Sequence, residues 1–96
     1  MLIAKVEGTA VSTVKHDSLA NQRLLLVTPA DPAGKPTGQP IVAVDLVGAG
    51  EGELIFIAQG STARIAAGSE GNAADAAVVG IVDSLHYGGE NTFQKS

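Results

Sequence analysis

The middle of this chain contains segments whose apolar side chains fall on both odd and even positions. In residues 41–47, the even positions include Val42, Val44 and Leu46, and the odd positions include Ile41, Ala43 and Val47. In residues 53–58, Leu54 and Phe56 likewise alternate with Ile55 and Ile57. Strands that are apolar on both faces need cover on both sides. This pattern limits the folds that a chain of 96 residues can adopt by itself.

The rest of the pattern indicates short strands and one small helix. Residues 2–15 alternate with period two, and Gly8 within them suggests a bend or bulge. A loop with three prolines occupies 31–40, and Ser61 is a suitable N-cap for a helix at 63–67 that Gly68 would end. The expected strands are 2–15, 23–28, 41–47, 53–58 and 76–85, with a short strand or arm at 91–95.

This arrangement predicts an all-β fold, a small closed or partly open barrel of five or six strands with one short helix. We expect a single domain over residues 1–96, with 86–96 as a C-terminal tail or short strand. A helix of about two turns cannot cover the outside of such a barrel. Each Val, Leu or Ile left uncovered forfeits roughly 1.5–3 kcal/mol of burial. Partner subunits are the simplest cover, so the sequence predicts an oligomer.

Composition excludes several classes of function. The net charge of −4 and the three aromatic residues, Phe56, Tyr87 and Phe93, do not suit a nucleic-acid binder, which needs basic grooves and stacking platforms. The absence of cysteine excludes disulfides, thiol catalysis and cysteine-based zinc sites. No apolar run approaches the ~20 residues of a membrane span, and we expect a cytoplasmic protein.

Two glycine-containing motifs are candidates for binding a nucleotide or another anion. Gly48 and Gly50 belong to a segment that resembles a nucleotide-binding loop, but Glu53 takes the third glycine position and a strand follows. A tight connector between strands is the favoured interpretation. The segment Gly60-Ser61-Thr62-Ala63-Arg64 lacks the Walker lysine. A capped helix start is favoured there, and weak anion or pore contact at the helix N-terminus is the alternative.

The remaining polar candidates do not form an evident catalytic or metal site. His16, Asp17 and Ser18 are neighbours in a polar loop, and His16 and His86 lack a third ligand for a metal. Asp45 and Asp83 stand inside apolar strands, and buried carboxylates need partners. Arg64 is a candidate partner for one of them. A salt bridge for folding or assembly is favoured over paired acid/base chemistry, so we expect no enzyme, metal or cofactor.

Four blocks of sequence resemble the pentameric vertex proteins of bacterial microcompartments, of the carboxysome and ethanolamine-utilisation type. The blocks are GTAVSTVK at 8–15, VDLVGAGEGE at 44–53, GSTAR at 60–64 and DAAVVGIVD at 75–83, and the match runs in order from residue 1 to about 85. Thr62 replaces a usual Ser, Asn21 stands where Gly is common, and Arg23 where Lys is common. The residues from His86 onward fit no fixed pattern.

The resemblance implies an oligonucleotide-binding-like five-stranded barrel and a homopentamer that closes the five-fold vertices of an icosahedral shell in the cytoplasm. Its neighbours would be hexameric and pseudohexameric shell proteins, with no nucleic acid, membrane or cofactor. Cyclic symmetry requires head-to-tail interfaces between two unlike surfaces. The residues expected near interfaces or the central opening are Asp45, Gly48, Gly50, Glu53, Ser61, Thr62, Arg64 and Asp83.

Two other classes of function remain open at this point. The first is an oligonucleotide-binding-fold module that binds a nucleic acid or small ligand. The second is a small enzyme or ligand-binding protein that uses Asp45 or Asp83. The second class requires both carboxylates to line one cleft.

Overall fold

A computed structural model of the chain describes residues 1–11, 23–66 and 76–95. In these ranges the chain forms seven strands and one helix. They are β1 (Leu2–Thr9), β2 (Leu24–Pro29), β3 (Ile41–Asp45), β4 (Leu54–Gln59), α1 (Gly60–Ala66), β5 (Ala76–Ile81), β6 (Ser84–Tyr87) and β7 (Glu90–Gln94). The polar loop with His16, Asp17, Ser18 and Asn21, and the helix stop expected at Gly68, lie outside the described residues.

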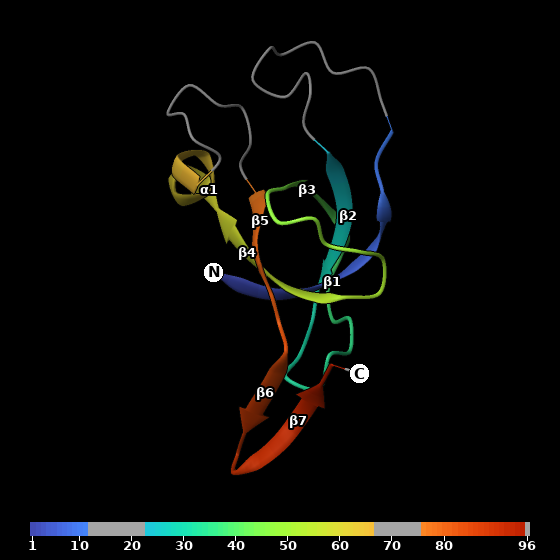
Figure 1. Cartoon of the computed structure of the whole chain (residues 1–96), viewed down its shortest axis with the longest axis vertical. Coiled ribbons are helices and arrows are strands. Elements are labelled where there is room, and N and C mark those ends of the chain that lie inside the picture. The colour runs from blue at the N-terminus through green and yellow to red at the C-terminus, as the bar shows by residue number, and fades with distance from the viewer. Residues whose placement is uncertain (12–22, 67–75, 96) are drawn as a thin grey trace.

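Five strands close into a barrel in the order β1-β2-β3-β5-β4, and β6 and β7 form a separate hairpin that projects from it (Figure 1). Neighbouring barrel strands are antiparallel except β3 and β5, which run parallel. The expected all-β class, with a small five-stranded barrel and one short helix, is confirmed. No described helix is long and apolar enough to cross a membrane.

The barrel interior is filled by aliphatic side chains from alternate positions of each strand. Its buried members are Ala4, Val6, Leu25, Val27, Ala43, Ile55, Ile57, Ala76 and Val78, with Ala49 from the loop after β3. These side chains belong to one parity of each strand, as the two-residue period of a pleated sheet requires. Small and branched aliphatic residues therefore suffice for the core, and Phe56 lies on the other parity of β4.

Gly8 marks a β-bulge, as the sequence indicates. The β1–β2 register passes from Val6 opposite Val27 to Gly8 opposite Leu26, which leaves one extra residue in β1. A bulge bends and twists a strand. β1 pairs with β4 over residues 2–5 and with β2 over residues 4–9. β1 ends at Thr9, although the Ala10 N–H still donates to the Leu24 carbonyl over 3.0 Å, and residues 12–15 of the expected strand lie outside the described residues.

The expected strand at 76–85 is divided into two elements. Val82 is buried and its N–H donates to the Leu54 carbonyl over 2.9 Å, so it makes the last contact with the barrel wall. Asp83 is exposed, and beyond it the chain leaves the barrel to form β6. The expected turn at Gly88 and Gly89 joins β6 to β7. These two strands pair with each other, so the C-terminal residues form a hairpin.

The outer faces of the barrel are covered unevenly. Ala58 on β4 and Ala77 on β5 are buried beneath Ala63 of α1. The helix begins at Gly60, one residue before the expected cap at Ser61. In contrast, Leu26 on β2 and Val42 on β3 are exposed. The apolar surplus on both strand faces is therefore real, and one short helix covers only part of it.

Candidate functional site

A buried carboxylate organises the loop that follows β3. The Asp45 side chain is 1% exposed, and Arg23 Nη1 lies 2.8 Å from its Oδ2. The backbone N–H groups of Val47, Gly48 and Ala49 also donate to this carboxylate, over 3.0 to 3.3 Å. A buried charge needs such hydrogen bonds and an opposite charge to offset desolvation. Asp45 therefore fixes the path of the chain immediately after the strand.

Arg23 is the basic partner of Asp45 among the described residues. The Asp45 N–H donates to the Arg23 carbonyl over 2.8 Å, because the start of β2 and the end of β3 are antiparallel neighbours. The guanidinium then reaches both Asp45 and the Ala49 carbonyl, at 2.9 Å. Arg64 was expected as a candidate partner for either Asp45 or Asp83, and its side chain lies outside the described residues, so that expectation stays a prediction.

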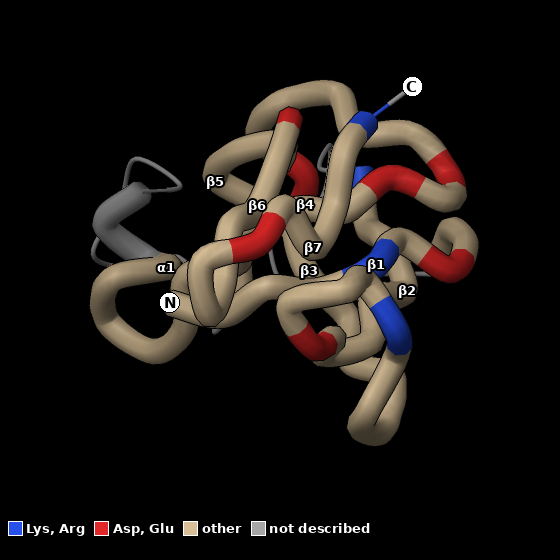
Figure 2. Tube along the Cα trace, turned by 90° about the horizontal axis from the view of Figure 1, so that it is seen from below, with Lys and Arg blue, Asp and Glu red and all other residues tan. Residues whose placement is uncertain are grey.

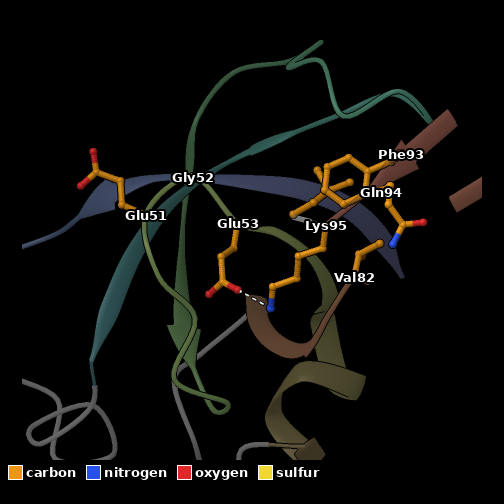
Figure 3. Close-up of a pocket in the computed structure, with 8 residues that line it drawn as sticks. Glu51, Gly52, Glu53, Val82, Phe93, Gln94 and Lys95 are labelled. Atoms are coloured by element: carbon orange, nitrogen blue, oxygen red, sulfur yellow. Dashed lines mark ion pairs between the residues drawn. The ribbon is translucent and has the colours of Figure 1, made fainter. Parts of the chain in front are cut away.

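The other end of the same loop is fixed by a second carboxylate. The Gly50 N–H donates to Glu53 Oε1 over 2.6 Å, and Lys95 Nζ lies 2.9 Å from Glu53 Oε2 (Figure 3). The Gly50 hydrogen bond, followed by the Lys95 contact, holds the pKa of Glu53 below its usual value of 4.5. The same contact raises the pKa of Lys95. Glu53 therefore ties the loop to the residue that follows β7.

The Glu53–Lys95 pair borders a pocket of about 360 Å³ between the barrel and the hairpin. Figure 3 shows the two side chains approaching each other beside Val82, Phe93 and Gln94. Neither Asp45 nor Asp83 lines this pocket. The pair of carboxylates that the sequence suggested for acid/base chemistry is therefore not brought into this pocket, whose acidic residues are Glu51 and Glu53.

Asp83 differs from the expectation of a buried carboxylate within a strand. It is exposed and stands between β5 and β6, because the barrel wall ends at Val82. Its backbone carbonyl accepts a hydrogen bond from the Lys95 N–H over 2.8 Å. The described role of Asp83 is thus a backbone contact at the base of the hairpin.

The candidate residues fall into separate groups. Asp45 ends β3, and Gly48, Gly50 and Glu53 lie in the loop that joins it to β4. Ser61 and Thr62 are instead exposed in the first turn of α1, beyond the far end of β4. Gly48 has a φ of +78°, which favours glycine at that turn. The geometry supports the reading of residues 48–53 as a tight connector, with glutamate in place of the third glycine.

Lys95 and Arg23 are the residues that sequence reasoning missed in these networks. Antiparallel pairing of residues 23–28 with 41–47 was a signal for Arg23, since that register sets Arg23 near Asp45. Lys95 gave no comparable signal, because its contact with Glu53 depends on how the hairpin folds back. Within residues 1–11, 23–66 and 76–95, no group of three or more His, Asp or Glu side chains could hold a metal ion.

The charged positions do not gather into a basic surface. Figure 2 shows acidic and basic positions interspersed over the described chain. Binding along a phosphate backbone depends on a positive stripe or groove. The described residues therefore offer no electrostatic footprint for a nucleic acid, in keeping with the net charge of −4.

The comparisons with known proteins agree with this structural reading. Residues 1–83 match the family described as "Ethanolamine utilisation protein EutN/carboxysome". The bacterial microcompartment shell vertex protein EutN of Escherichia coli K12 is 46% identical over 95 residues, which cover 99% of this chain and 100% of the relative. The carboxysome shell vertex protein CcmL of Gloeobacter violaceus is 41% identical, with 99% and 95% covered.

A solved structure adds the assembly state of one relative. The structure described as "GrpN pentameric microcompartment shell protein from Rhodospirillum rubrum" has a TM-score of 0.82 and 44% identity, and it covers 91% of this chain and 99% of that chain. The identity and the coverage are high enough to show common ancestry as well as a common fold. This chain belongs to the EutN/carboxysome family of proteins.

Proposed function

We propose that this protein is a structural component of a bacterial microcompartment shell, located in the cytoplasm, where it forms homopentamers that close the five-fold vertices. The observation that carries the proposal is the match along nearly the whole chain to proteins named as shell vertex proteins. The pentameric GrpN structure supports the assembly state. The exposed apolar residues of β2 and β3 supply the surface that an oligomer needs.

A structural role also fits the chemistry of the candidate residues. Both oxygens of Asp45 already accept hydrogen bonds from the protein, and Glu53 is held by Gly50 and Lys95. These carboxylates hold a loop in place, and each is paired with a basic side chain, Asp45 with Arg23 and Glu53 with Lys95. We therefore propose that the protein is not an enzyme and needs no cofactor.

The natural neighbours of such a pentamer are hexameric and pseudohexameric shell proteins, since pentamers supply the curvature that flat hexamers lack. We propose that the loop with Asp45, Gly48, Gly50 and Glu53, the helix start with Ser61, Thr62 and Arg64, and Asp83 lie near subunit interfaces or the central opening. Nucleic acid and membrane are not partners in this proposal. The alternative of a nucleic-acid-binding barrel is disfavoured by the interspersed charges.

Shell closure tests this function directly. A hexameric shell protein from the same source would be produced with and without this chain, and the purified particles imaged by electron microscopy. We expect closed polyhedral particles with the chain, and open sheets or tubes without it. Closed particles of the same shape and number in both preparations would contradict the proposed role.

A further inference from the structure

A cyclic homo-oligomer needs two unlike surfaces on each subunit, because every interface joins the front of one copy to the back of the next. The outside of this barrel carries two apolar regions that no described element covers completely. They lie on different strands, β2 and β3 for one and β1 and β4 for the other.

The first region is the Leu26–Val42 surface, defined by these two residues. They stand opposite each other in the β2–β3 register and are 36% and 47% exposed. A hollow of about 390 Å³ adjoins Val42 and is lined by Ile41, Val42, Gln59 and Ala76. It forms where β3 pairs with β5 at only two positions, Val44 with Ala77 and Asp45 with Val78. This region therefore combines exposed aliphatic side chains with a depression.

The second region is the Ile3–Phe56 surface. Ile3 and Phe56 are half-buried partners in the β1–β4 register. Phe56 shares its parity of β4 with Leu54 and Ala58, which are both only 2% exposed. Leu54 lies close to Gly34, beside Phe93, and Ala58 is packed under α1. Phe56 is thus the position of this outer face that the hairpin and the helix leave partly open.

Glycine on the neighbouring strand shapes this second surface. A Cβ atom at Gly80 would lie 3.4 Å from Phe56 Cδ2, so the ring rests directly against the backbone of β5. The ring is held by its own barrel and still presents an apolar edge outward. A fixed aromatic side chain loses little conformational entropy on binding, which suits a contact between subunits.

We propose that the Leu26–Val42 surface of one subunit packs against the Ile3–Phe56 surface of the next subunit in the ring. The occupant of each surface is therefore a second copy of this chain. The assignment rests on the proposed homopentamer, and it adds which strands meet. One head-to-tail contact would then bury the apolar side chains that point outward from β2, β3 and β4.

The test uses one charge substitution on each surface and one matched control. Val42→Glu alters the first surface and Ile3→Glu the second, with Ile3→Ser as a milder second variant. Val11→Glu is the control, since Val11 is 95% exposed and belongs to neither surface. Circular dichroism and thermal unfolding establish that each variant remains folded, and native mass spectrometry gives the number of chains per complex.

We expect Val42→Glu and Ile3→Glu each to be monomeric at concentrations where the wild type and Val11→Glu are pentameric. A buried charge without a partner should weaken each contact by about a hundredfold or more. In an equimolar mixture, the intact Ile3–Phe56 surface of Val42→Glu can bind the intact Leu26–Val42 surface of Ile3→Glu. The mixture should therefore give a one-to-one dimer that does not grow further.

Other outcomes overturn the inference in recognisable ways. If folded Val42→Glu, or both second-surface variants, remain pentameric beside a pentameric wild type, these surfaces are not the interface, and the proposed function stands. A mixture that stays monomeric shows that the two surfaces do not face each other. If the wild type itself is not pentameric, the proposed function fails, and this assignment fails with it.

Discussion

Arg23 and Asp45 form an ion pair in which the acid is buried and the base is not. Their side chains are 50% and 1% exposed, and Arg23 Nη1 lies 2.8 Å from Asp45 Oδ2. The asymmetry arises because Asp45 also serves three backbone donors of its own loop. Asp45 therefore fixes the loop, and the half-exposed Arg23 side chain supplies the positive charge that offsets the buried carboxylate.

This asymmetry predicts unequal effects of the two neutral substitutions. Asp45→Asn places an amide NH₂ among backbone donors and should lower the free energy of unfolding by about 2–3 kcal/mol. Arg23→Gln should cost about 1 kcal/mol or less, because the guanidinium is half exposed and the backbone donors remain. Urea unfolding of both variants, with Glu90→Gln as an exposed control, measures the difference. A larger loss for Arg23→Gln than for Asp45→Asn would contradict this account of the loop.

The Glu53–Lys95 pair predicts a pH dependence of stability. The pKa of Glu53 is lowered in the folded state, so its contribution is present above the usual value of 4.5 and is lost as the pH falls through the folded value. Glu53→Gln should therefore be less stable than wild type at pH 7, and the difference should shrink below about pH 4. Thermal unfolding between pH 3 and pH 8 measures it. A difference that is constant over this range would exclude ionised Glu53 as the source.

Gly34 lies where Phe93 of the hairpin packs against the barrel, so a side chain at this position should disturb that packing. Its φ is +86°, and a Cβ there would lie 3.2 Å from Phe93 Cδ1. Gly89 has a φ of +81° with no atom within 4 Å, so it shares the backbone strain without the contact. Gly89→Ala should cost about 1–2 kcal/mol of unfolding free energy, and Gly34→Ala measurably more. In a Phe93→Ala background the excess should disappear, and its persistence there would refute the packing explanation.

The hairpin of β6 and β7 should be less protected than the barrel. A two-stranded sheet is marginally stable by itself, and this one is fixed near its base by Phe93 and Lys95. Amide hydrogen exchange should be faster in Ser84–Tyr87 and Glu90–Gln94 than in the buried strands, and Lys95→Met should increase exchange in the hairpin alone. Equal protection in hairpin and barrel, or a Lys95→Met effect spread over both, would contradict local anchoring.

Short apolar segments separated by glycine- and proline-containing turns predicted the barrel, and apolar residues on both parities predicted an oligomer. The ends of β3 and β4 were predicted within two residues, and Gly8 marked the bulge. The divided strand after Ile81 was not predictable from parity, since residues 78–82 are apolar throughout. What ends β5 is the loss of a barrel neighbour beyond Val82, which is a tertiary effect.

The sequence indicated which carboxylates need partners in the loop after β3, but not which basic residues supply them. Asp45 was singled out because a carboxylate among apolar residues needs partners, and Glu53 because it takes the third glycine position of the loop. The partners came from elsewhere in the chain, Arg23 across a strand pair and Lys95 after the hairpin.

The central claim is that this chain assembles into a closed ring of five. Native mass spectrometry of the wild-type protein at micromolar concentration and physiological ionic strength measures this number directly. The account predicts one dominant species at five times the 9.6 kDa mass of the chain, which persists on moderate dilution. A stable monomer, or a ring with any other number of subunits as the dominant species, would contradict it.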